Sequence, residues 1–146
     1  MEGNTVMDKD IKRSIILDNY QNSNMKHTSD DSYVKINTRN VSCIDNLDFM
    51  MKIEDDKVVD IKFDGEACAI STSATSIMIR SLIGKSVEDA RKILTNYSNM
   101  INEKEYDEEL LGELVVYDEI CKQPNRKNCA LLPENAIDKM LGELNK

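Results

Sequence analysis

The hydrophobic pattern at the start of the chain predicts a short helix, a polar loop and a first strand. Within Lys9–Tyr20 the isoleucines recur at helical spacing, which is typical of an amphipathic helix. Polar residues then fill Gln21–Ser32, a composition typical of a loop. The short apolar run Tyr33–Ile36 has strand composition. We therefore expect a helix that is followed, after a polar connection, by a strand.

The next two segments predict an antiparallel hairpin. Leu47–Ile53 and Lys57–Phe63 both have strand composition, and the acidic residues 54–56 between them suit a tight turn. In the second arm apolar and polar residues alternate, which is typical of a sheet with one buried face. The residues expected on that buried face are Val59, Ile61 and Phe63.

After Gly65 the spacing of apolar residues changes from two to about 3.6, which marks a change from strand to helix. This helix is expected to stop at Gly84. A second helix is expected to begin at Ser86–Asp89, which resembles a capping box. The inward faces of the two helices are expected to carry Ile70, Ala74, Ile77, Met78 and Leu82, and then Val87, Ala90, Leu94, Tyr97 and Ile101.

The last third of the chain predicts two more helices. A charged connection over Asn102–Glu109 precedes a short helix at Leu110–Tyr117. Pro133 suits the first turn of a final helix, whose inward face carries Ala136, Ile137, Met140, Leu141 and Leu144. Strands early and helices late predict an α+β fold, a small three-stranded antiparallel sheet packed by about five helices. Residues 1–8 are expected to be a flexible tail, and residues 9–146 a single domain.

Composition narrows the classes of function. The chain has 146 residues and a net charge of -8, without a basic stripe, so nucleic-acid binding is not expected. Residues 1–10 lack the apolar core of a signal peptide, and no apolar run approaches about 18 residues, so no membrane segment is expected. We therefore expect a cytoplasmic protein. In that compartment four cysteines indicate metal binding or catalysis before they indicate disulfides.

Three of the cysteines lie at expected element boundaries. Cys43 precedes the hairpin, Cys68 lies between a strand and a helix, and Cys129 comes just before the expected last helix. A thiol at a helix N-terminus meets the positive end of the helix dipole, which favours the thiolate. Asp45 lies two residues after Cys43, and three thiolates with one carboxylate can complete a tetrahedral zinc site.

Cysteine spacing by itself leaves two interpretations open. The three residues are separated by 25 and 61 positions, unlike a zinc knuckle, so they either share a site or are scattered buried cysteines. Arg126, three residues before Cys129, also has two interpretations. Its cation can steady a thiolate or an incoming anionic persulfide, or it can simply be a solvated surface arginine.

A family resemblance bears on this choice. The second-cysteine motif of U-type iron–sulfur cluster assembly proteins, the NifU N-terminal and IscU-like family, resembles residues 64–76, Asp-Gly-Glu-Ala-Cys-Ala-Ile-Ser-Thr-Ser-Ala-Thr-Ser. Residues 40–45, 124–130 and 15–20 resemble the family's first-cysteine loop, third-cysteine region and first helix, in that order. The long segment around Leu94–Cys121, and Asn128 where the classical scaffolds commonly have histidine, resemble the SufU branch.

The resemblance implies a fold and a function. It implies a small antiparallel sheet packed by helices, with zinc held by Cys43, Asp45, Cys68 and Cys129. Cys129 would accept persulfide sulfur from a SufS-like cysteine desulfurase, with support from Arg126, and pass it to downstream iron–sulfur assembly or apo-proteins. The alternative is a scaffold that builds a transient 2Fe–2S cluster on the same residues, and a third is a non-catalytic domain stabilised by zinc. Cys121 and His27 match no family ligand.

The sequence also departs from the family pattern. Val41 and Ile44 replace a proline and a glycine beside the first cysteine. Ala67 replaces a glycine often found before Cys68, and Asn19 replaces a common histidine in the first helix. Because loss of glycine narrows the allowed backbone conformations, the loop before the hairpin is expected to be stiffer or differently shaped.

Overall fold

An antiparallel sheet of three strands forms one side of the molecule. The computed structural model describes residues 8–40 and 44–144, so the predicted tail lies outside the described residues except for Asp8. The central strand β2 (Asn46–Glu54) pairs with β1 (Val34–Arg39) on one edge and with β3 (Lys57–Glu66) on the other. The predicted hairpin is therefore present, and the predicted α+β fold class is confirmed.

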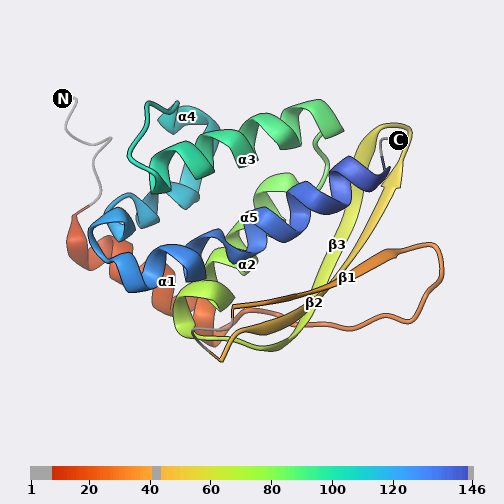
Figure 1. The fold of residues 1–146 in the computed structure, drawn as a ribbon, viewed down its shortest axis with the longest axis horizontal. Helices are drawn as coiled ribbons and strands as arrows, with labels where there is room; N and C mark the ends of the chain where they lie inside the picture. Colours follow the sequence, from red (N-terminus) through yellow and green to blue (C-terminus); the bar gives the residue numbers. More distant parts are fainter. Residues whose placement is uncertain (1–7, 41–43, 145–146) are drawn as a thin grey trace.

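The helices gather beside the sheet (Figure 1). Helix α2 contacts α1 and α5, and α5 in turn contacts α3 and reaches β1 and β2. The described elements are α1 (Lys9–Gln21), α2 (Ala69–Leu82), α3 (Val87–Ile101), α4 (Glu108–Leu111), the 3-10 helices η2 (Gly112–Tyr117) and η3 (Ile120–Lys122), and α5 (Pro124–Leu144). In the part of the chain that the structure describes, no helix has the length and apolar character needed to cross a membrane.

The core lies between the sheet and the helices, as the apolar periods predicted. Leu47, Phe49 and Met51 of β2 are fully buried, and Phe49 stacks on Phe63 of β3 with ring centroids 6.3 Å apart. The N-cap of α3 also follows the prediction, because Ser86 Oγ accepts the backbone N–H of Asp89 at 3.0 Å. Local periodicity thus identified most of the residues that hold the two layers together.

The prediction that one residue of β3 faces the core is wrong. Val59 is 41% exposed, whereas its neighbour Val58 is fully buried. The pairing of β2 with β3 shifts at this point: Ile53 lies opposite Val58 and Lys52 opposite Asp60, which leaves Val59 as an extra residue on the bulged strand. A bulge changes which residues of the strand face the core. A simple two-residue period cannot predict this change.

Two predicted helices near the C-terminus differ from the structure. Leu110–Tyr117 is divided between α4 and η2, because Gly112 adopts a positive φ of 53° that ends the α-helix. The last helix starts at Pro124, nine residues before the predicted start, and Pro133 lies inside it. The proline removes the N–H that would bond the Cys129 carbonyl one turn earlier. Ser71 Oγ donates to that carbonyl instead, at 2.9 Å.

A buried carboxylate on α5 makes stability depend on pH. The side chain of Glu134 is buried, and burial, followed by the nearby Asp138 carboxylate, raises the pKa of Glu134 to about 7. The folded protein therefore keeps a proton that the unfolded chain releases near pH 4.5. The stability that this proton contributes is fully present below that pH and is lost as the pH rises through 7.

Glu134→Gln is expected to stabilise the protein at pH 8 by up to about 3 kcal/mol, because a neutral amide avoids the cost of a buried charge. At pH 5 the variant and the wild type should be nearly equal. Thermal midpoints measured at both pH values check this. Glu143→Gln, which removes the same charge from an exposed position of α5, is the control and should change little. Equal midpoints for Glu134→Gln and wild type at pH 8 would contradict the prediction.

Candidate metal centre

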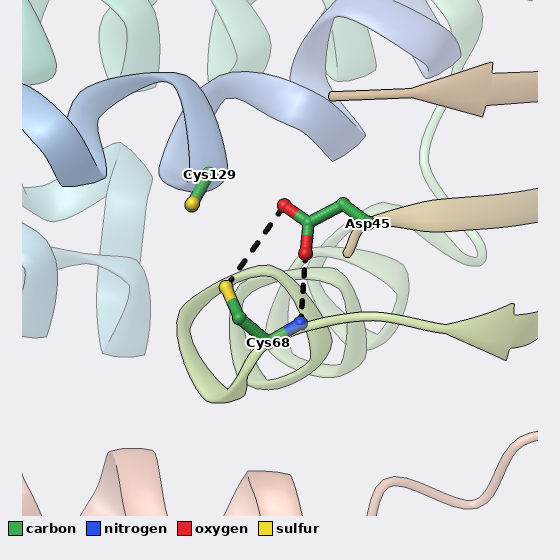
Figure 2. Close-up of side chains that lie close together, drawn as sticks. All are labelled: Asp45, Cys68 and Cys129. Atoms are coloured by element: carbon green, nitrogen blue, oxygen red, sulfur yellow. Dashed lines mark hydrogen bonds between the residues drawn. The ribbon is translucent and has the colours of Figure 1, made fainter. Parts of the chain in front are cut away.

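Three residues distant in sequence converge where the sheet meets the helices. Asp45 precedes β2, Cys68 precedes α2, and Cys129 lies in α5, and one ligand atom of each lies within 4.8 Å of the other two. Figure 2 shows the Asp45 carboxylate pointing between the two sulfur atoms. Cys43, the fourth predicted ligand, lies outside the described residues. The described part of the centre therefore offers two sulfur atoms and one carboxylate.

Hydrogen bonds fix the orientation of Asp45. The residue is 2% exposed, its Oδ1 accepts the backbone N–H of Cys68 at 2.7 Å, and its Oδ2 accepts the hydroxyl of Ser71 at 2.6 Å. Burial acts to raise the pKa of Asp45, but the hydrogen bonds from Ser71 and Cys68 outweigh it and hold the pKa below its ordinary value. Asp45 is thus a buried, ionised and oriented carboxylate.

Cys68 is placed by the end of the hairpin and by the start of α2. Gly65 has φ of 134°, and a Cβ atom there would overlap the backbone oxygen of Asn46, so only glycine lets the strands approach this closely. Asn46 pairs with Glu66 across the hairpin, which brings Asp45 and Cys68 to the same end of the sheet. Cys68 is then the N-cap of α2, where its Sγ accepts the N–H of Ser71 at 3.4 Å.

Cys129 approaches the centre from the opposite side, inside α5 (Figure 2). It is fully buried, and the side-chain amide of Asn40 donates to its Sγ at 3.5 Å. The prediction that Cys129 lies just before the last helix was wrong, because α5 already begins at Pro124. Of the two cysteines only Cys68 lies at a helix N-terminus, where the helix dipole favours the thiolate.

The described residues fit a zinc ion in donor type and in spacing. Tetrahedral zinc, with bonds near 2.3 Å to sulfur and 2.0–2.2 Å to oxygen, holds neighbouring sulfur and oxygen atoms roughly 3.6 Å apart. Cys68 Sγ and Asp45 Oδ2 are 3.9 Å apart. A buried carboxylate also calls for a compensating cation. Among the described residues no lysine, arginine or histidine forms an ion pair with Asp45.

The other residues considered in the sequence lie outside this group. Arg126 is exposed in the first turns of α5, three residues before Cys129. Cys121 is half-buried and its Sγ donates to the backbone oxygen of Asp118 at 3.7 Å. His27 Nδ1 lies 3.9 Å from the Asp64 carboxylate, and both side chains are exposed. None of the three joins the group of Asp45, Cys68 and Cys129.

Sequence reasoning missed two polar residues that organise the centre. Ser71 bonds both Asp45 and the Cys129 carbonyl, and Asn40 bonds the Cys129 sulfur. The backbone N–H of Asn40 also donates to the Asp45 carbonyl at 3.1 Å. Their positions three residues from Cys68 and Cys43 are the one signal in the sequence, and serine and asparagine are too common for that signal to be specific. Asn19, a departure from the family, is buried and accepts the hydroxyl of Ser76, which ties α1 to α2.

Comparison with known proteins decides the family. The profile of the NifU-like N terminal domain matches residues 11–141, nearly the whole chain. The chain belongs to the NifU-like N-terminal domain family. The match confirms the resemblance that the cysteine motifs predicted, and it covers every described residue of the candidate metal centre.

The similar proteins include both a SufU protein and an IscU scaffold protein. Over 128 residues the chain is 36% identical to the zinc-dependent sulfurtransferase SufU of Bacillus subtilis (strain 168), covering 87% of this chain and 86% of that relative. It is 28% identical over 131 residues to the iron–sulfur cluster assembly scaffold protein IscU of Thermotoga maritima, covering 90% and 92%. The similarity to SufU confirms the predicted SufU-like character of this family member.

A solved structure agrees with this placement. The crystal structure of FiSufU from Fervidobacterium islandicum AW-1, described as an iron–sulfur cluster assembly scaffold protein for the SUF system, superposes with a TM-score of 0.83. The two chains are 31% identical, and the match covers 87% of this chain and 93% of that one. The sheet and helices described above are therefore the family fold.

Proposed function

We propose that this chain is a cytoplasmic iron–sulfur cluster assembly protein that binds zinc and takes persulfide sulfur from a SufS-like cysteine desulfurase. The convergence of Asp45, Cys68 and Cys129 carries the proposal, with Cys43 as the fourth ligand. The 36% identity to a zinc-dependent sulfurtransferase supports zinc as the metal and sulfur transfer as the activity. When bound, zinc holds the sulfur ligands as thiolates and guards them against oxidation.

In the proposed reaction Cys129 is the sulfur acceptor. Its thiolate attacks the outer sulfur of the desulfurase persulfide, R–S–SH, so that a new sulfur–sulfur bond forms at Cys129. The bond between the two persulfide sulfurs breaks, and the desulfurase cysteine leaves as a thiolate. No oxidant is needed, because one thiolate replaces another. Cys129 is fully buried, so its surroundings must open when the desulfurase docks.

Two further residues support this step. Asp45 is held by Cys68 and Ser71, and it would serve as the oxygen ligand that helps to hold or exchange a metal ion. Arg126 is exposed one helical turn before Cys129, where its guanidinium can meet an incoming anionic persulfide. Sulfur then passes to downstream iron–sulfur assembly or apo-proteins.

A second candidate function is a scaffold for a transient 2Fe–2S cluster. The similarity to an IscU scaffold over 90% of the chain favours it, and cysteine thiolates ligate iron–sulfur clusters as well as zinc. The same residues would then hold iron. We rank this candidate second because the identity to SufU is higher, 36% against 28%.

Metal analysis and desulfurase kinetics together test the two candidates. Protein purified without oxygen is expected to be colourless, to carry about one equivalent of zinc, and to accelerate a SufS-like desulfurase several-fold. A coloured cluster that transfers to an apo-protein, with no acceleration of any desulfurase, would instead establish the scaffold function. Metal-free protein that neither binds zinc nor accelerates a desulfurase would contradict both.

A further inference from the structure

The hydroxyl of Ser71 lies close to several groups of the metal centre. Ser71 is fully buried in the first turn of α2. Its Oγ lies 2.6 Å from Asp45 Oδ2, 2.9 Å from the Cys129 carbonyl oxygen and 3.6 Å from Cys68 Sγ. Its backbone N–H also donates to Cys68 Sγ at 3.4 Å. One residue therefore contacts all three described members of the centre.

The helix around Cys129 is built so that it can receive this hydroxyl. Inside an α-helix the carbonyl of residue 129 would accept the N–H of residue 133. Residue 133 is proline and has no N–H, so it cannot make that bond. The Ser71 hydroxyl of α2 lies within hydrogen-bond distance of both this carbonyl and the Asp45 carboxylate, and it thereby links Cys129 to Asp45.

We propose that Ser71 is the positioning residue of this metal centre, and that Pro133, which offers no N–H, favours its contact with the Cys129 carbonyl. Ser71 is not itself a ligand. The hydroxyl has one proton and two acceptors, the Asp45 carboxylate and the Cys129 carbonyl, and it can shift its proton from one to the other. It thereby keeps both ligand-bearing elements in place whether or not Asp45 engages a metal. This role deepens the proposed metal centre and rests on it.

The test is the zinc affinity of folded variants, measured by competition with a chromophoric chelator. Ser71→Ala is expected to bind zinc 10- to 100-fold more weakly than wild type, the usual effect of removing a residue that orients a ligand. Ser73→Ala is the matched control: Ser73 is an equally buried serine of α2, but it bonds Tyr117 and not the centre. Its zinc affinity should stay within about threefold of wild type.

A second pair of variants tests the role of Pro133 and provides a folded background. In Pro133→Ala the helix can supply its own N–H to the Cys129 carbonyl, so this oxygen depends less on the Ser71 hydroxyl. Ser71→Ala should therefore lower the thermal midpoint of the metal-free protein less in the Pro133→Ala background than in wild type. Its loss of zinc affinity should persist there, because the bond to Asp45 is still missing.

The outcomes separate this proposal from the proposed function. If wild type binds zinc and Ser71→Ala binds it equally well in either background, the positioning role is overturned while the metal centre stands. If wild type itself does not bind zinc, the metal centre fails first. Equal thermal effects of Ser71→Ala in both backgrounds would overturn the part assigned to Pro133.

Discussion

Cys129→Ser is expected to abolish the acceleration of a cysteine desulfurase and to return turnover to the rate of the desulfurase alone. A serine hydroxyl cannot form a persulfide, and it is a poor zinc ligand compared with a thiolate. The change is nearly isosteric, so the fully buried site should keep its packing. Desulfurase turnover with and without the variant, together with mass spectrometry of the persulfide on the accepting protein, checks the result.

The chain offers a matched control for this experiment. Cys121 is half-buried in η3 and is not part of the group formed by Asp45, Cys68 and Cys129. Cys121→Ser should therefore accelerate the desulfurase as well as wild type does. If Cys129→Ser still acquires persulfide sulfur and Cys68→Ser does not, the acceptor is the more accessible Cys68 and the assignment to Cys129 is wrong.

Replacement of Asp45 is expected to produce the second largest effect, a loss of zinc affinity of about 100-fold or more. Removing a residue that only orients a ligand already costs 10- to 100-fold, and Asp45 is proposed as a ligand itself. Both Asp45→Ala and Asp45→Asn should show this loss in competition with a chelator. A zinc affinity within about threefold of wild type in both variants would exclude Asp45 as a ligand.

The two substitutions should differ in the stability of the metal-free protein. Asp45→Ala leaves the partly buried N–H of Cys68 without its acceptor, which costs up to about 1–3 kcal/mol. Asp45→Asn keeps an oxygen in the same place and can still accept that N–H. We therefore expect a lower thermal midpoint for Asp45→Ala than for Asp45→Asn, although both bind zinc weakly. Equal midpoints would show that this hydrogen bond contributes little to folding.

The sequence predicted features that have local causes better than features that depend on distant contacts. The change of apolar period after Gly65 predicted the passage from β3 to α2, because a period depends on residues a few positions apart. The bulge at Val59 and the early start of α5 at Pro124 escaped prediction. The bulge depends on the pairing of β2 with β3. For α5, the sequence suggests Pro133 as the helix start, whereas Pro124 holds that position and Pro133 lies inside the helix.

The sequence by itself determined the family of this protein, its α+β fold and the residue types that can bind a metal. Motifs and hydrophobic periods depend only on the order of residues along the chain. Only the tertiary structure decided that Asp45, Cys68 and Cys129 meet, since spacing alone favoured scattered buried cysteines over a shared site. It also decided that Ser71 joins them, through contacts with the Asp45 carboxylate and the Cys129 carbonyl. Such a contact joins two helices far apart in the chain, and its distance depends on how those helices pack against the sheet.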